Sequence, residues 1–173
     1  MYGYRGTILR VNLTTGEIKK EALDQELAKQ YIGGRGLAEK MFSNEVDAKV
    51  EPFEPENKLI IATGPLSGTP TPTGGRYMVI TKSPLTGTIA SSNSGGRWGA
   101  ELKFAGYDMI VVEGKSEKPV YINIKDDEVS IRDAGHLWGK MTSEATEMLL
   151  KETDEKAKVL NIGPAGEKLS RIA

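Results

Sequence analysis

The chain contains no cysteine, and this absence excludes several kinds of chemistry from its own side chains. Without thiols the chain cannot form disulfides, provide a cysteine nucleophile, or supply the ligands of an iron–sulfur cluster or a structural zinc ion. It contains one histidine, His136, which leaves few ligands for other transition metals. His136 lies in the run 133–138 (DAGHLW), which we interpret as a turn before a helix, so a turn or capping role is expected for it.

A basic excess and long apolar runs are also lacking. With 23 Lys and Arg against 24 Asp and Glu, the net charge is -1, so bulk electrostatic binding to nucleic acid is not expected. No apolar run approaches the roughly 18 residues of a membrane span. The first residues, MYGYR, lack the apolar core of a signal peptide. We therefore expect a cytoplasmic protein with neither nucleic acid nor membrane as a partner.

Acidic residues are absent from residues 61–100, where the only charges are Arg76, Lys82 and Arg97. The same window holds eight of the 20 glycines, four of the eight prolines and twelve Ser or Thr residues. Accessible backbone N–H groups, hydroxyls and arginines without competing carboxylates suit an anion, above all a phosphate. These residue types also form ordinary turns. Of the two interpretations we favour a functional, anion-binding surface.

Short β-branched and apolar runs bounded by turn residues predict strands, and apolar residues at helical spacing predict helices. The predicted strands are 6–13, 17–23, 58–63, 77–81, 88–91, 109–113, 120–124, 128–132 and 158–162, with a further strand-like pattern at 167–173. The predicted helices are 24–31, 37–42, 94–106 and 142–152. Because helices do not alternate regularly with strands, we expect an α+β fold of mostly β-sheets with a few short helices, in one compact domain.

Details of two helices are also predicted. In the helix that starts near Ser94, the residues expected to pack are Ala100, Leu102, Phe104 and Ala105, with Gly106 as the stop. In the helix 142–152, Thr142 or Ser143 is expected to act as the N-cap, and Ala145, Met148 and Leu149 fall on one face.

Two glycine-containing loops flank the predicted hairpin of residues 77–91. In the first, Arg76 directly follows two glycines, so a ligand can approach the backbone beside a guanidinium group. In the second, residues 92–96 (SNSGG) precede a helix and offer unpaired N–H groups. We expect the two loops to face one ligand. Neither a P-loop nor a Gly-x-Gly-x-x-Gly fingerprint occurs.

Two other glycine clusters have two interpretations each. Residues 33–36 (GGRG) are interpreted as a structural helix break in preference to a ligand contact, and residues 163–166 (GPAG) fit either role equally.

Six blocks in a fixed order together resemble the N-terminal domain of the aldehyde ferredoxin oxidoreductase family. They are 64–69 (GPLSGT), 72–76 (PTGGR), 81–87 (TKSPLTG), 93–96 (NSGG), 102–108 (LKFAGYD) and 162–167 (IGPAGE), with 10–13 (RVNL) and 34–38 (GRGLA) in agreement. The resemblance covers essentially the whole chain.

The resemblance implies that residues 1–173 are the pterin-cofactor-binding N-terminal domain of a longer enzyme, truncated at its C-terminal end. Members of the family are oxidoreductases that oxidise aldehydes to carboxylic acids and pass electrons through a [4Fe–4S] cluster to ferredoxin. Their tungsten, or molybdenum, is held by two pyranopterins whose phosphates are bridged by magnesium. The N-terminal domain forms a base of β-sheets beneath this bis-pyranopterin unit.

Carried over to this sequence, the resemblance gives five residues a role in cofactor binding. Arg76 matches an arginine between pterin and cluster, and Asn93 matches a residue whose backbone carbonyl helps to coordinate the magnesium ion. Ser94, Gly95 and Gly96 are expected to line the same pterin surface. No catalytic residue is expected here, because the cluster-binding cysteines, the acidic pterin-binding motifs and the proton-transfer residues of the family lie in later domains.

The chain alone is therefore expected to be inactive, and to self-associate as a homo-oligomer through surface that the missing C-terminal domains would cover. The alternative is a stand-alone binding module for a small phosphorylated ligand.

Overall fold

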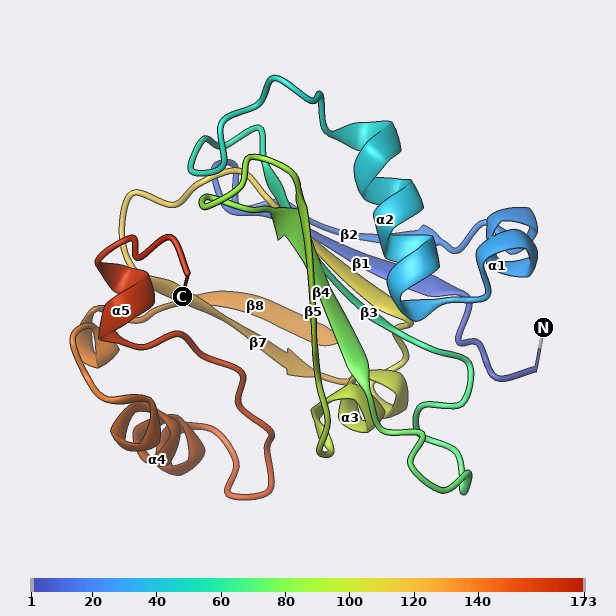
Figure 1. Cartoon of the computed structure of the whole chain (residues 1–173). Helices are drawn as coiled ribbons and strands as arrows, with labels where there is room; N and C mark the ends of the chain where they lie inside the picture. Colours follow the sequence, from blue (N-terminus) through green and yellow to red (C-terminus); the bar gives the residue numbers. More distant parts are fainter. Residues whose placement is uncertain (1, 173) are drawn as a thin grey trace.

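A six-stranded mixed β-sheet forms the centre of the molecule in the computed structural model, which describes residues 2–172 (Figure 1). Its strands are β1 (Thr7–Asn12), β2 (Ile18–Ala22), β3 (Lys58–Thr63), β4 (Tyr77–Lys82), β5 (Ile89–Ser94) and β6 (Met109–Glu113). The strand order is β2-β1-β6-β3-β4-β5. β1 and β6 are parallel, and every other neighbouring pair is antiparallel.

One face of this sheet is covered by two helices, α1 (Gln25–Tyr31) and α2 (Gly34–Glu45). Asp24 caps α1 by accepting hydrogen bonds from the backbone N–H groups of Glu26 and Leu27. Buried apolar side chains of α2, among them Leu37 and Phe42, pack on the sheet and form the larger core. Burial of this apolar area is the main stabilising contribution of the layer.

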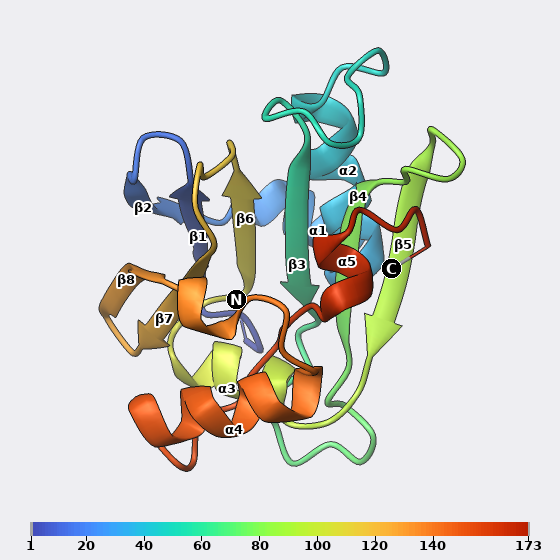
Figure 2. The ribbon, with the colours of Figure 1, turned by 90° about the vertical axis from the view of Figure 1, so that its left-hand side faces the viewer.

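The opposite face carries α3 (Trp98–Phe104) and a two-stranded hairpin of β7 (Val120–Lys125) and β8 (Glu128–Asp133). Leu9, Leu102 and Tyr107 are buried between these elements and the sheet. The 3-10 helix η1 (Gly135–Leu137), α4 (Thr142–Glu152) and the short α5 (Pro164–Glu167) lie on this same side (Figure 2).

The α+β class and the single domain are confirmed, as are the eight predicted strands up to residue 132. The predicted strand 158–162 is wrong, because these residues pair with no described strand and Ile162 is 63% exposed. Residues 163–166 contribute to α5 instead. The strand-like pattern at 167–173 is also wrong as far as residue 172, where α5 ends and turns follow, and residue 173 lies outside the described residues.

The predicted details of α3 and α4 need three corrections. Leu102 is buried as expected, but Phe104 is 54% exposed and the neighbouring Lys103 is buried. Residues 94–97 are not helical, since α3 begins at Trp98. The N-cap of α4 is Met141, without a side-chain hydrogen bond, because Thr142 already lies in the first turn.

His136 lies in η1, between β8 and α4, where its Nε2 atom is 2.9 Å from a carboxylate oxygen of Glu152. No helix in residues 2–172 is both long and apolar enough to cross a membrane.

Candidate anion-binding site

The loop between β3 and β4, residues 64–76, is folded tightly on itself. The Leu66 carbonyl accepts hydrogen bonds from the backbone N–H and the hydroxyl of Thr69, at 3.2 and 2.7 Å. The buried Ser67 hydroxyl donates to the Arg76 carbonyl at 3.2 Å. A Cβ atom at Gly74 would lie only 2.9 Å from the Leu66 carbonyl oxygen, so the turn requires glycine there. These contacts give the end of the loop, where Arg76 lies, a defined position.

Arg76 and Asn93 meet on the α2 side of the sheet. The Nη1 atom of Arg76 donates a hydrogen bond to the side-chain oxygen of Asn93, which lies in β5 opposite Met78. Met78 also faces α2, because a Cβ atom at Gly34 would lie 3.5 Å from its Cγ atom. Side chains directly opposite on adjacent strands share one face. The guanidinium and amide groups are both exposed on that face.

The second glycine loop touches the first. A Cβ atom at Gly75 would lie 2.8 Å from the carbonyl oxygen of Gly96, so the backbones approach as closely as only glycine permits. Gly96 has a φ of 81°, which also favours glycine, whereas a side chain at Gly95 would meet nothing within 4 Å. The structure thus brings together the two loops that the sequence analysis paired. We call the group Arg76, Asn93, Gly95 and Gly96 the β4–β5 corner.

The backbone of Asn93 points to the open edge of the sheet. The N–H group of Ser83 donates to the Thr88 carbonyl at 2.8 Å, where the β4–β5 hairpin closes. Bonded and non-bonded residue pairs alternate along an antiparallel ladder. The Ser83–Thr88 pair is bonded, so every second pair from it along the ladder is bonded too. The Met78–Asn93 pair falls between two of these and is therefore non-bonded. Because β5 is an edge strand, the Asn93 carbonyl is directed away from β4, and it accepts no hydrogen bond from the described residues.

Ser94 belongs to a different surface from Arg76. Residues 92–94 are part of β5, so the expected loop is shorter than predicted, and the Ser94 side chain shares the opposite face with Tyr77. There it lines a hollow together with Arg97, Trp98 and Lys158. The rings of Tyr77 and Trp98 lie with centroids 4.9 Å apart. Sequence reasoning expected one loop surface and did not foresee that the strand continues, because β5 lacks apolar alternation.

Arg76 and Arg97, at this end of the sheet, have no acidic partners among the described residues. Among residues 2–172, neither Arg76 nor Arg97 forms a salt bridge. At the other end of the sheet Arg10 and Lys58 are both neutralised by Glu45 and Glu113, at distances between 2.6 and 3.1 Å. The positive charge beside Asn93 is therefore available to an anion.

The glycines at 33–36 break the helix between α1 and α2, beside the start of the 64–76 loop. Gly33 has a φ of 154°, and its Cβ position would lie 3.2 Å from the Thr63 carbonyl oxygen and 3.4 Å from the Gly64 Cα atom. This close approach supports the structural role. Gly34 and Arg35 lie within the first turn of α2.

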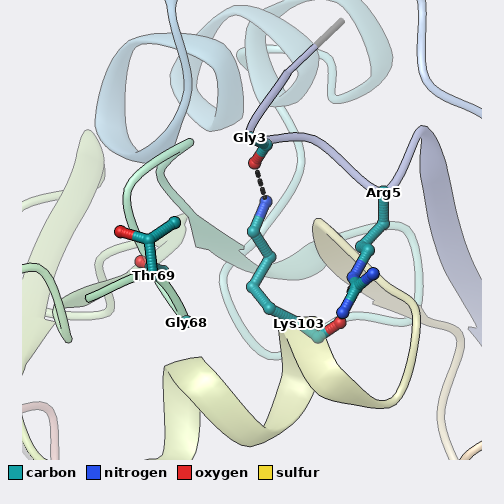
Figure 3. Close-up of a pocket in the computed structure, with 6 residues that line it drawn as sticks. Gly3, Arg5, Gly68, Thr69 and Lys103 are labelled. Atoms are coloured by element: carbon teal, nitrogen blue, oxygen red, sulfur yellow. Dashed lines mark hydrogen bonds between the residues drawn. The ribbon is translucent and has the colours of Figure 1, made fainter. Parts of the chain in front are cut away.

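A charged pair that the sequence analysis missed lies beneath the 64–76 loop. Lys103 of α3 and Asp108 before β6 form a salt bridge, with side chains 5% and 4% exposed. Figure 3 shows Lys103 in a small pocket that is also lined by Gly3, Arg5 and Thr69. The signal for it was present in the block 102–108, where a lysine lies between two apolar residues and an aspartate follows five residues later.

Comparison with known proteins identifies the family. The sequence model of the family "Aldehyde ferredoxin oxidoreductase, N-terminal domain" matches residues 8–173. The chain belongs to this family. It is 62% identical to the tungsten-containing aldehyde ferredoxin oxidoreductase of Pyrococcus furiosus and 60% identical to that of Thermococcus kodakarensis, over its whole length in both cases. The chain spans 29% of the length of each of these relatives.

A solved structure agrees with the fold. The active-site complex BamBC of benzoyl coenzyme A reductase, with 1,5-dienoyl-CoA, superimposes with a TM-score of 0.94 at 46% identity. The match covers 96% of this chain and 26% of that chain. The family expected from the sequence is thus confirmed, while the roles of Arg76, Asn93, Ser94, Gly95 and Gly96 remain predictions.

Proposed function

We propose that this chain is the N-terminal, tungstopterin-binding domain of an oxidoreductase that oxidises aldehydes to carboxylic acids with ferredoxin as electron acceptor. The observation that carries the proposal is the β4–β5 corner, where the exposed Arg76 guanidinium lies against Asn93 without an acidic partner. Pterin phosphates are the anions that this corner would bind.

The donor set fits a phosphate bridged by magnesium. A phosphate needs fixed positive charge and N–H donors, which the Arg76 guanidinium provides. Magnesium prefers oxygen ligands and is commonly shared with phosphates, and the outward carbonyl of Asn93 is such a ligand. Gly95 and Gly96 carry no side chains, so the cofactor can approach the backbone between them.

Each residue of the corner then has one task. Arg76 orients the phosphates and offsets their charge, and its contact with Asn93 holds the guanidinium in place. With magnesium bound, Asn93 would contribute its carbonyl as an oxygen ligand, while Ser94 would extend the polar surface to the other side of β5. When bound, the tungsten pterin supplies the two-electron chemistry of aldehyde oxidation.

Substrate selection and electron transfer are assigned to parts of the enzyme outside these residues. The chain has no cysteine, so a [4Fe–4S] cluster would need ligands from elsewhere in the longer enzyme. The benzoyl coenzyme A reductase complex shares this domain at 46% identity although its name gives a different reaction. This supports a domain that binds the cofactor and leaves the choice of substrate to others.

Inorganic phosphate is a direct probe of the corner. In a heteronuclear NMR titration of the chain with phosphate, we expect shifts at the Arg76 Nε–H and at the amides of Gly95 and Gly96. The affinity should be weak and should fall with added salt, because one wall of the site is exposed to solvent. Arg76→Ala should weaken binding about tenfold, which corresponds to ~1.4 kcal/mol.

The matched control is Arg132→Ala. Arg132 is an exposed arginine on β8, and within residues 2–172 its side chain bonds only Ser130 of its own strand. Its replacement removes the same charge without touching the corner and should leave the shifts unchanged. Equal weakening by the two substitutions would show nonspecific electrostatics and would contradict the proposal.

A further inference from the structure

The Lys103–Asp108 ion pair is almost completely buried, although both side chains carry charges. The Nζ atom of Lys103 donates to the Asp108 carboxylate and, at 2.8 Å, to the Gly3 carbonyl. The same carboxylate accepts the backbone N–H groups of Arg5 and Gly6, at 3.1 and 2.7 Å. All its donors come from α3 and from the segment that leads into β1.

This pair is linked to the start of the 64–76 loop. The backbone N–H and the hydroxyl of Thr63, the last residue of β3, donate to the Asp108 carbonyl at 3.0 and 2.8 Å. Thr63 is itself buried. The point at which the loop leaves the sheet is therefore fixed by the residue that carries the buried carboxylate.

The middle of the loop rests on the other partner. At Gly68, which has a φ of 76°, a Cβ atom would lie 3.2 Å from the Cβ atom of Lys103. The Gly3 residue that accepts the Lys103 bond approaches Pro65, since its own Cβ atom would lie 2.7 Å from the Pro65 carbonyl oxygen. Figure 3 shows Lys103 between Arg5 and the Gly68–Thr69 part of the loop, with its amino group bonded to the Gly3 carbonyl.

The end of the loop completes the connection to the corner. Ser67, next to Gly68, donates its hydroxyl to the Arg76 carbonyl. A displacement of Gly68 would move this hydroxyl and with it the backbone of Arg76. Contacts thus run without interruption from the ion pair to the residue that holds the anion.

We propose that Lys103 and Asp108 are positioning residues, which set the conformation of the 64–76 loop and so the location of the Arg76 guanidinium. The proposal rests on the proposed function of the corner. A buried ion pair is weak evidence for stability, because desolvation of the two charges offsets much of their attraction. Its directional bonds to the backbone of Gly3, Arg5 and Gly6 fix the segment that approaches the loop at Pro65, and so favour one loop conformation.

The test uses the double variant Lys103→Met with Asp108→Asn. It removes both charges together, so no single charge is left buried, and it keeps similar side-chain volumes. By amide hydrogen exchange of the 173-residue chain, residues 64–76 should exchange at least about tenfold faster, while β1 and β6 stay protected. Phosphate binding at Arg76 should weaken by a similar factor.

The control is Lys58→Met with Glu45→Gln, which removes an ion pair at the opposite end of β3. It should lower overall stability without changing exchange in the loop or phosphate binding. A folded Lys103 and Asp108 double variant with unchanged loop exchange would overturn the proposal. If the double variant fails to fold, amide exchange of the single variant Lys103→Met is compared with that of the control at a partially denaturing urea concentration. Equal protection of residues 64–76 in these two variants would also overturn the proposal.

The phosphate-binding and hydrogen-exchange measurements test the two proposals separately. Lack of phosphate binding by the unmodified chain would count against the proposed function only, while the exchange arm would still report on the ion pair. Faster exchange with unchanged phosphate binding would refute the link to Arg76.

Discussion

Gly95 of the β4–β5 corner and the adjacent Gly75 differ in what a side chain would meet. Gly95 has open space around its Cβ position, whereas a Cβ atom at Gly75 would lie 2.8 Å from the Gly96 carbonyl oxygen. The first glycine is therefore dispensable for folding, and the second holds the two loops together.

Gly95→Val should keep the fold and lose ligand affinity. We expect a change of about 0.5 kcal/mol or less in the free energy of unfolding, since the site is exposed. Phosphate affinity should fall about tenfold, because the branched side chain obstructs approach to the backbone. Urea unfolding and the phosphate titration measure the two effects. Gly75→Ala is the comparison, and it should lower stability as well as binding; a stable Gly75→Ala with normal affinity would contradict this account.

Sequence reasoning reached the identity of the corner residues but not their contacts. Arg76 and Asn93 are 17 positions apart, and only the β4–β5 register brings them together. Phe104 was expected to pack, but it is exposed and the neighbouring Lys103 is buried in its place, where it pairs with the Asp108 carboxylate. Tertiary partners of this kind leave no periodic signal in one sequence.

At the scale of elements, α4 begins without a side-chain cap. Its N-cap, Met141, has φ -63° and ψ 149°, a conformation that a capping serine also adopts, and its side chain is 65% exposed. The first N–H groups of the helix therefore lack the acceptor that Ser, Thr, Asp or Asn would provide.

Met141→Ser should stabilise the domain by about 0.5–1 kcal/mol, because the serine hydroxyl can accept a hydrogen bond from the first turn of α4. The midpoint of urea unfolding measures the change. Met141→Ala removes the same apolar side chain without adding an acceptor and should give no gain. A gain of equal size in both variants would assign the effect to the lost exposed methionine.

Elements with their own apolar pattern were predicted well, and elements that depend on a partner were not. β3 and β6 are short apolar runs whose bounds follow directly from the sequence. Residues 158–162 have a similar pattern, but no described strand lies beside them, and a strand exists only when it is paired. The polar end of β5 shows the converse case, since pairing with β4 extends a strand through Ser92, Asn93 and Ser94.

At the scale of the whole molecule, one ionic cluster joins four strands and a helix. Arg10 of β1 contacts Glu21 of β2, Glu45 of α2 and Glu113 of β6, and Lys58 of β3 contacts the last two. Burial raises the pKa of Glu45 and Glu113, but the hydrogen bonds from Arg10 and Lys58 outweigh it and hold each pKa below its ordinary value.

This cluster should make stability sensitive to acid. A carboxyl whose pKa is lower in the folded state stabilises the fold above its unfolded pKa and loses that contribution as pH falls through the folded value. Glu45→Gln should therefore lower the free energy of unfolding by about 1–2 kcal/mol at pH 7, and the difference from the unmodified chain should shrink below about pH 5. Urea unfolding at pH 7, 5 and 3.5 tests this.

Glu26→Gln is the control, because Glu26 forms an exposed pair with Lys29 and should contribute little at any pH. If the free energy of unfolding of Glu45→Gln stays below that of the unmodified chain by a constant amount down to pH 3.5, the carboxylate charge is not the stabilising element.

The strand order also determines when during synthesis the six-stranded sheet becomes complete. β6 lies between β1 and β3 in the sheet, yet it is the last of the six strands in the chain. Ile8 pairs with Met109, so β1 has no partner on that side until more than 100 residues have been made. At bacterial or eukaryotic synthesis rates of about 5–20 residues per second, this takes roughly 5–20 s.

Until then the nascent chain holds two separate pieces, the β1–β2 hairpin and the β3–β4–β5 meander, each with an open edge. Asp108, which immediately precedes β6, reaches the loop at the same moment as the strand that joins the two pieces. The corner that carries Arg76 is therefore expected to become ordered only after β6 has been made.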